Sequence, residues 1–123
     1  MTTTCWGYHL ILNLSECELS KMTDKDNIQN CVNEILQKTD MKAMGPTIYE
    51  YAEMKDDHIE VAGYTVVQII ITSCLVMHMA EHTRGIYFDF FSCKPYNKED
   101  VKDIVAKYFN SSTMSEIYLT RKA

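Results

Sequence analysis

Alternating apolar and polar residues along the chain predict the strands of a β-sheet. From Tyr8 to Leu14 the large apolar side chains occupy every second position, so this strand has one apolar face and presents His9 on the other. Further strands are predicted at 47–52, 63–71, 73–80, 86–92 and 116–120. The segment 63–71 is almost continuously apolar, which is typical of a central strand buried on both faces.

Apolar residues spaced three or four positions apart predict two helices. The first follows Thr23, a residue type that caps helices, has Asp26 three positions later and runs to about Lys38. The second begins near Asn97. Its expected buried positions are Val101, Ile104, Val105 and Tyr108. Between the helices, Gly45-Pro46 interrupts the pattern and Lys55-Asp56-Asp57 predicts a polar turn.

The order of these elements predicts the architecture. A strand, a helix, several strands, a second helix and a last strand favour an α+β fold, a two-layer sandwich whose antiparallel sheet is covered on one face by two helices. The chain has 123 residues, with neither an internal repeat nor a linker, so residues 1–123 are expected to form a single domain.

The composition argues against a nucleic acid partner, a membrane span and disulfide bonds. Twelve basic and seventeen acidic residues give a net charge of -5, which argues against a nucleic acid polymer. The longest apolar run, 65–77, is shorter than the roughly 20 residues that cross a membrane. The beginning of the chain lacks the pattern of a signal peptide. The five cysteines are odd in number and show no paired metal-type spacing, which favours reduced thiols in a cytoplasmic protein.

A possible metal motif occurs at the end of the predicted strand 73–80. His78, Glu81 and His82 form the pattern H-x-x-E-H, which binds zinc in some peptidases when it lies on a helix. Here the preceding residues alternate as in a strand, and Arg84-Gly85 follows at once. We therefore expect polar residues at a strand end and a turn, and no metal site.

A second constellation joins a hydroxyl, an imidazole and a thiol. Ser73 begins one predicted strand, His78 lies five residues later, and Cys93 ends the next strand on the face that carries Asp89. If adjacent strands brought these groups together, they would suit a nucleophile, a base and a proton donor. The same spacing also fits a strand-end serine, a partly buried histidine and a core cysteine.

Three blocks of sequence carry a family resemblance. They read G-Y-H-L-I-L-N-L-S-E-C from Gly7, T-S-C-L-V-M-H from Thr72 and G-I-Y-F-D-F-F-S-C from Gly85. In their order and in the register between them, these blocks resemble the G-x-H-L-x-x-D-L-x-G-C, E-S-H-x-x-x-H and G-Y-A-A-x-D-x-F-T-C motifs of small bacterial and archaeal S-adenosylmethionine (AdoMet) decarboxylases. The resemblance covers most of the chain.

The resemblance implies roles for three residues. Ser73 matches the serine at which the family cleaves its own chain, which converts that residue into a pyruvoyl group. His78 matches the processing histidine, and Cys93 matches the catalytic proton donor. In the family, the pyruvoyl carbonyl forms a Schiff base with the substrate amine and accepts electrons as carbon dioxide leaves.

The sequence also departs from the family motifs. Thr72 stands where the family has Glu before the cleaved serine, and Cys74 stands where His is common. The family's H-T-W-P-E becomes His78-Met-Ala-Glu-His, which lacks Trp and Pro and shifts Glu81 by one position. Asn13 replaces an Asp. The changes concern the processing junction and the substrate pocket, and the core pattern is retained.

One functional hypothesis is a lyase that needs neither cofactor nor self-cleavage. The carboxylate of AdoMet, or of an AdoMet–nucleotide conjugate used in signalling, would displace methylthioadenosine and close to homoserine lactone. Aromatic rings can steady the sulfonium, and acidic groups complement its charge. The candidate binding residues are Tyr8, His9, Tyr49, Tyr51, Tyr64, Tyr87, Glu50 and Asp89, and Glu81 joins Ser73, His78 and Cys93 as a candidate catalytic residue.

Two alternatives remain open beside the lyase. The chain could be a self-processing decarboxylase whose cofactor is a pyruvoyl group derived from Ser73, acting on AdoMet, ornithine or arginine. It could also be a catalytically inactive paralogue that regulates an active partner. The two enzyme hypotheses predict a small-molecule substrate, and the family resemblance also implies a homo-oligomer.

Overall fold

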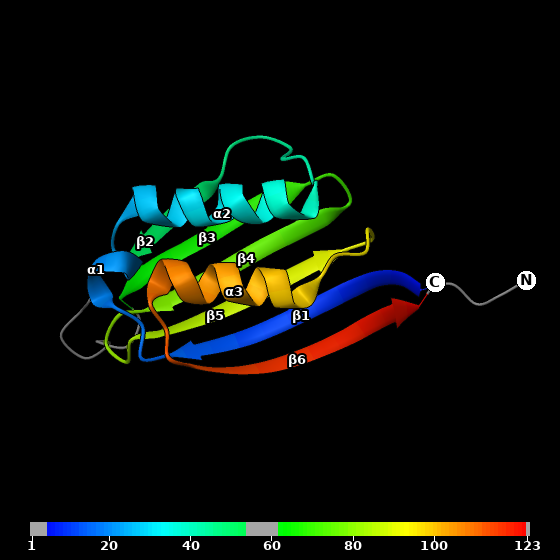
Figure 1. The fold of residues 1–123 in the computed structure, drawn as a ribbon. Coiled ribbons are helices and arrows are strands. Elements are labelled where there is room, and N and C mark those ends of the chain that lie inside the picture. Colours follow the sequence, from blue (N-terminus) through cyan, green and yellow to red (C-terminus); the bar gives the residue numbers. More distant parts are fainter. Residues whose placement is uncertain (1–4, 54–61, 123) are drawn as a thin grey trace, which may run out of the picture.

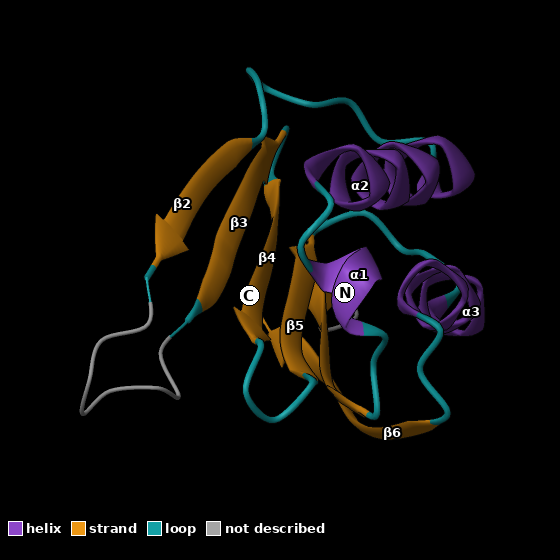
Figure 2. Ribbon diagram, turned by 90° about the vertical axis from the view of Figure 1, so that its left-hand side faces the viewer, coloured by secondary structure: helices purple, strands orange, loops and turns teal. Residues whose placement is uncertain are grey.

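The computed structural model describes residues 5–53 and 62–122, which form two layers (Figure 1). The described strands are β1 (Cys5–Ser15), β2 (Ile48–Ala52), β3 (Gly63–Ile70), β4 (Ser73–Ala80), β5 (Gly85–Ser92) and β6 (Thr113–Lys122). The described helices are α1 (Leu19–Met22), α2 (Lys25–Thr39) and α3 (Lys98–Phe109). All three helices lie on the same side of the sheet (Figure 2). The predicted α+β sandwich with one covered face is confirmed.

The strand order places distant segments side by side. The sheet runs β2-β3-β4-β5-β1-β6, and each neighbouring pair is antiparallel. The register sets Ser73 opposite Ser92, and Ser92 opposite Tyr8. The start of β4, the end of β5 and the beginning of β1 therefore meet at one end of the sheet, on the right in Figure 1.

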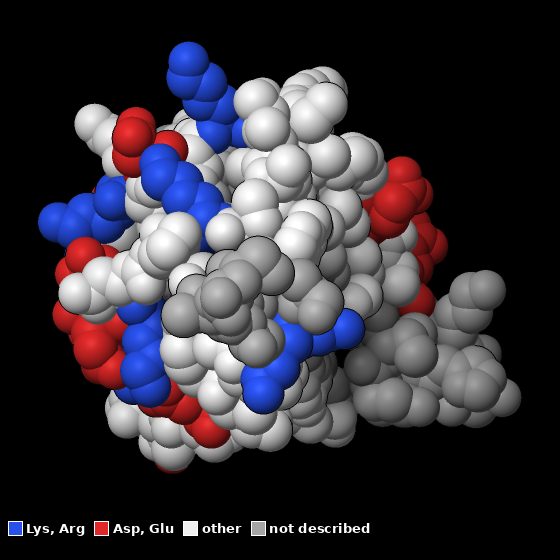
Figure 3. All heavy atoms as spheres, turned by 90° about the vertical axis from the view of Figure 1, so that its right-hand side faces the viewer, with Lys and Arg blue, Asp and Glu red and all other residues white. Residues whose placement is uncertain are grey.

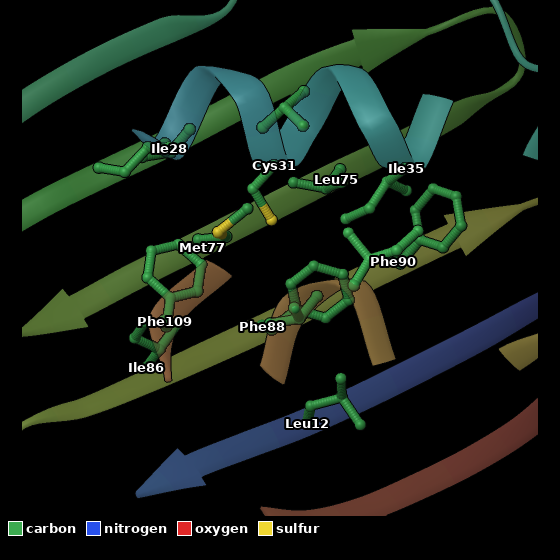
Figure 4. Packing of buried hydrophobic residues seen from close by; sticks show 14 of the residues in the cluster. Leu12, Ile28, Cys31, Ile35, Leu75, Met77, Ile86, Phe88, Phe90 and Phe109 are labelled. Carbon is green, nitrogen blue, oxygen red and sulfur yellow. The ribbon is translucent and has the colours of Figure 1, made fainter. Parts of the chain in front are cut away.

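The core forms where the apolar face of the sheet meets the helices. Leu10, Leu12, Phe88 and Phe90 are fully buried, as the alternation in β1 and β5 predicts. Figure 4 shows residues of α2, among them Ile35, pointing toward this layer of side chains. Each large apolar side chain buried in this way contributes about 1.5–3 kcal/mol to folding.

The helices differ from the prediction in three details. Asp24, not Thr23, caps α2, because its carboxylate accepts hydrogen bonds from the backbone N–H groups of Asp26 and Asn27. Thr23 instead ends α1, a single helical turn that the periodicity did not predict. In α3, Val101, Ile104 and Val105 are buried as predicted, but the buried aromatic residue is Phe109 and not Tyr108.

The strand 63–71 is not buried on both faces, which corrects the prediction. Ile69 is 46% exposed and Ile71 is 52% exposed. The helices cover one side of the sheet only, so alternate residues of this apolar run face outward. We call this side the open face; it carries the odd-numbered residues of β1, β3, β5 and β6 and the even-numbered residues of β4.

Three further sequence predictions can be compared with the structure. The last strand, β6, is longer than the predicted 116–120, because it pairs along the whole of β1. The predicted polar turn at Lys55-Asp56-Asp57 lies outside the described residues. Among the described helices, none has the length and apolar character required to span a membrane.

Candidate active site

A two-residue turn, Ile71 and Thr72, joins β3 to β4. Thr72 has a φ of 57°, a left-handed conformation that is unusual for a β-branched residue and costs about 1–3 kcal/mol. Its hydroxyl donates to the carbonyl oxygen of Ile71 at 2.6 Å and accepts a hydrogen bond from the Cys93 thiol at 2.8 Å. Cys93 therefore helps to hold the strained turn in place.

The two residues of the Thr72–Ser73 peptide bond each form a hydrogen bond with a residue at the end of β5. The backbone N–H of Cys93 donates to the Thr72 carbonyl oxygen over a long distance of 3.4 Å. The Ser73 hydroxyl donates to Oγ of Ser92 at 2.7 Å. Ser92 is fully buried, and its Oγ also accepts the backbone N–H of Lys94 at 2.9 Å. The β3–β4 turn and the adjoining ends of β4 and β5 thus bring together four side chains around a single peptide bond, those of Thr72, Ser73, Ser92 and Cys93.

Sequence reasoning named Ser73 and Cys93 and missed Ser92. The structure places Ser73 and Cys93 on either side of Thr72, as adjacent strands were expected to do. The sequence signals for Ser92 were its place immediately before Cys93 and the hydroxyl residue that the family motif F-T-C has at this position. The register then sets Ser92 opposite Ser73.

A cavity of about 270 Å³ adjoins the same junction. Its lining residues are Asp40, Met41, Lys42, Ile71, Thr72, Ser73 and Lys94. The Lys94 ammonium donates to the carbonyl oxygen of Asp40 at 2.5 Å, which ties the end of β5 to the end of α2. Both basic and acidic side chains lie over this end of the molecule, which faces the viewer in Figure 3. The cavity leaves room for a small molecule beside Ser73.

His78 does not lie near Ser73 within the chain. The two residues are five positions apart on β4, which in an extended strand corresponds to about 16 Å. They also point to opposite faces, because His78 is on the open face. There its Nδ1 lies 3.1 Å from the Thr65 hydroxyl, and Tyr87 is its neighbour on β5. A single chain therefore does not bring the predicted base to the predicted nucleophile.

His9 and Asp89 form a pair near the middle of the open face. Their Nε2 and Oδ1 atoms are 3.0 Å apart, and the ring of Phe91 meets the imidazole edge-on at 6.0 Å. Cys74, which follows Ser73, is also on this face. Burial, and to a lesser extent the charge of Asp89, raise the pKa of the Cys74 thiol, so this thiol stays protonated and is a poor nucleophile.

The predicted binding tyrosines do not form one pocket. Tyr64 contacts Tyr49 and Tyr51, with ring centroids 6.0 and 5.0 Å apart. This cluster lies along β2 and the beginning of β3; Tyr64 is six residues before Ile70, the neighbour of Ser73, which corresponds to about 20 Å. The ring of Tyr49 already has the Lys25 ammonium 4.7 Å from its centroid. Of the predicted tyrosines, Tyr8 lies at the Ser73 end, opposite Ser92.

Glu81 and His82 lie in the turn after β4, at the end of the sheet remote from Ser73. The Tyr51 hydroxyl donates to Oε1 of Glu81 at 3.2 Å, and Glu50 is exposed on the edge strand β2. Because His78 is on a strand and its two motif partners are in a turn, H-x-x-E-H lacks its helix. Within residues 5–53 and 62–122, no three His, Cys, Asp or Glu side chains are grouped to hold a metal ion.

Comparisons with known proteins agree with this fold. A model of the S-adenosylmethionine decarboxylase family matches residues 8–122. The crystal structure of the adenosylmethionine decarboxylase from Aquifex aeolicus superposes with a TM-score of 0.77 at 14% identity, and the match covers 98% of this chain and 93% of that chain. A comparison with curated proteins finds no match. Because the family model covers nearly the whole chain, this chain belongs to the S-adenosylmethionine decarboxylase family.

Proposed function

We propose that this chain is a self-processing, pyruvoyl-dependent decarboxylase that acts on AdoMet or a related amino acid. Family membership favours this activity over the carbon–sulfur lyase. The observation that carries the proposal is the geometry of the Thr72–Ser73 junction. A strained residue precedes the serine, its carbonyl oxygen accepts a backbone N–H, and the serine hydroxyl is held in a hydrogen bond.

The proposed cleavage begins with attack of Ser73 Oγ on the carbonyl carbon of Thr72. The amide nitrogen of Ser73 leaves as an amine and takes up the hydroxyl proton, so the peptide bond becomes an ester. The Cys93 N–H stabilises the negative charge that develops on the Thr72 oxygen. Because a single hydrogen bond in this role is worth about 3–4 kcal/mol in other enzymes, we expect the long 3.4 Å contact to shorten as the charge develops.

The ester then breaks by elimination. Loss of the Ser73 Cα proton to solvent breaks the bond between Cβ and Oγ, and Thr72 departs with that oxygen as a carboxylate. The unsaturated amine left at position 73 adds one water and releases one ammonia, which leaves a pyruvoyl group at the start of fragment 73–123. Relief of the left-handed conformation at Thr72 favours this reaction.

The residues around Ser73 fit such a group. A pyruvoyl group supplies an electron sink for the loss of carbon dioxide from an amino acid. Backbone pairing to Ile70 and Ser92 would hold residue 73 in place, and the adjoining cavity admits a substrate. The Cys93 thiol lies at the same junction and can return a proton to the carbon that loses carbon dioxide.

The sheet topology allows the chain to be cleaved without falling apart. Fragment 1–72 contributes β1, β2 and β3, and fragment 73–123 contributes β4, β5 and β6. In the strand order, β4 lies between β3 and β5, and β1 lies between β5 and β6. Strand β1 of the first fragment is thus inserted between two strands of the second, and the pair β4-β5 of the second fragment lies between β3 and β1 of the first. We therefore expect the two fragments to separate only on unfolding.

We also propose that the active form is a homo-oligomer. The distance between His78 and Ser73 prevents their contact within one chain, so a processing role for His78 requires a second copy. His78 is on the open face, where Ile69, Tyr87, Ile117 and Leu119 are between 38% and 59% exposed. Apolar side chains on an uncovered sheet face favour association.

Intact mass under denaturing conditions tests the function directly. We expect two fragments that meet between Thr72 and Ser73, the second one beginning with a pyruvoyl group, and release of carbon dioxide from carboxyl-labelled AdoMet. A single species of 14.3 kDa would overturn the proposal. If that species converted AdoMet to methylthioadenosine, the lyase hypothesis would replace it; if it showed no turnover, the regulatory paralogue would.

Strain at Thr72 can be tested by comparing glycine with alanine at this position. Both Thr72→Gly and Thr72→Ala remove the hydroxyl, but only glycine adopts a positive φ without cost. The Cβ penalty of about 1–2 kcal/mol in the left-handed region predicts that the Gly variant cleaves roughly 5- to 30-fold more slowly than the Ala variant. The fraction cleaved over time, followed by mass spectrometry, measures both rates. Equal rates would show that strain does not contribute to cleavage.

A further inference from the structure

We propose that Ser92 is a positioning residue for self-cleavage: its hydroxyl holds the Ser73 hydroxyl in the conformation that attacks Thr72. The inference rests on the proposed function, because it assigns a role within the cleavage reaction. It concerns a residue that stands in the third motif block, immediately before Cys93, but that was not among the expected catalytic residues.

The contacts of Ser92 point to this role. Its Oγ lies 2.7 Å from Oγ of Ser73, and the side chain is fully buried. The backbone N–H of Lys94 donates to the same oxygen at 2.9 Å, which fixes where the oxygen lies. Among the described side chains, Thr39, Gln68 and Ser92 are the buried polar ones, and of these only Ser92 bonds to the junction.

The hydrogen bond to Ser92 restricts the side-chain rotamer of Ser73 and therefore the position of the attacking oxygen. A serine side chain can occupy three rotamers, and only one of them is compatible with a donor–acceptor contact to a fixed oxygen. Donation to Ser92 also directs the Ser73 proton away from the attacking lone pairs. Correct placement of a reacting atom is worth a large factor in rate, since an error of about 1 Å can cost roughly 100-fold.

The cleavage reaction distinguishes a positioning role of Ser92 from a purely structural one. When the ester breaks, Oγ of Ser73 leaves with Thr72, so Ser92 loses the atom that it positions. A residue that acts only on that oxygen contributes to the cleavage rate and not to later turnover. A residue that merely supports the local fold contributes to both.

The experiment follows cleavage of the freshly translated full-length chain by mass spectrometry and then measures carbon dioxide release per cleaved site. We expect Ser92→Ala to slow cleavage roughly 10- to 100-fold and to leave turnover per cleaved site within about threefold of the wild type, which is the scatter typical of such contributions. Ser92→Thr keeps the hydroxyl and is expected to restore most of the cleavage rate.

The matched control is Ser111→Ala, which also removes a hydroxyl that makes two hydrogen bonds, here to the carbonyl oxygens of Ser15 and Thr113. This variant is expected to cleave at the wild-type rate. Thermal melting shows whether Ser92→Ala and Ser92→Thr fold. If Ser92→Ala does not, Ser92→Cys takes its place, because a thiol of similar size is only a weak hydrogen-bond acceptor, and the same loss of cleavage rate is expected.

Several outcomes would overturn the inference. Cleavage of Ser92→Ala at or above the wild-type rate would show that the hydrogen bond is neutral or restrains the nucleophile. Equal losses in cleavage and in turnover per site would assign Ser92 a purely structural role, as would a folded Ser92→Thr that cleaves no faster than Ser92→Ala. A wild-type chain that stays whole would instead refute the proposed function, and the inference with it.

Discussion

Replacement of Ser73 by alanine is expected to leave the chain whole and to abolish decarboxylation. The variant lacks the oxygen that attacks Thr72, and without cleavage no pyruvoyl group forms to accept electrons from the substrate. The hydroxyl makes one side-chain hydrogen bond, to Ser92, so its loss costs about 1 kcal/mol of stability. We therefore expect the Ser73→Ala variant to fold and to lose only self-cleavage and decarboxylation.

Two measurements check this expectation on the same preparation. Denaturing mass spectrometry should find one species in place of two, and carboxyl-labelled AdoMet should release no carbon dioxide. Ser73→Cys is an informative companion, because a thiol can also attack the Thr72 carbonyl and is expected to permit slow cleavage. A Ser73→Ala chain that still turned AdoMet over would exclude the pyruvoyl mechanism and return the function to the cofactor-free lyase.

Substitutions of Cys93 are expected to separate cleavage from turnover. Cys93→Ser keeps a hydroxyl that can donate to Thr72, and the backbone N–H that contacts the Thr72 carbonyl oxygen is unchanged. Cleavage should therefore continue. A serine hydroxyl is a far weaker acid than a thiol, whose reference pKa is about 8.5. Loss of the proton donor is expected to reduce carbon dioxide release per cleaved site by about 10²–10⁴-fold.

Cys93→Ala refines the same comparison. It removes the side-chain hydrogen bond to Thr72 as well, which is worth about 0.5–1.5 kcal/mol, so cleavage should slow about 2- to 10-fold relative to Cys93→Ser. Cys74→Ala is the control. The Cys74 side chain lies on the open face, so this substitution is expected to change neither the cleavage rate nor the turnover per cleaved site. Full turnover in Cys93→Ser would show that another group donates the proton.

The fold was largely predictable because its signals are local. Alternation in β1 and β5 reports which side chains enter the core, and this pattern placed Leu10, Leu12, Phe88 and Phe90 correctly. The apolar run of β3 led to the wrong prediction that this strand is buried on both faces. A continuous run does not reveal that helices cover only one face of the sheet. Asp24 was overlooked as the helix cap because two residues of suitable type, Thr23 and Asp24, stand side by side.

The active site was predictable only in part. Proximity of Ser73 and Cys93 followed from the expectation that consecutive strands pair, and the family motifs pointed to both residues. The expected proximity of His78 failed within one chain, because five residues of extended strand carry a side chain far away and onto the other face. The tyrosines, chosen by residue type alone, are divided between the two ends of the sheet.

The sequence by itself determined the element order, the apolar face of the sheet and the family, because these depend on residue types and spacings along the chain. Only the tertiary structure decided the strand order, the register that sets Ser73 opposite Ser92, and the left-handed turn at Thr72. Contacts between residues twenty positions apart depend on which backbone groups pair across strands. That pairing is decided by the packing of the whole sheet against its helices, and no short segment encodes it.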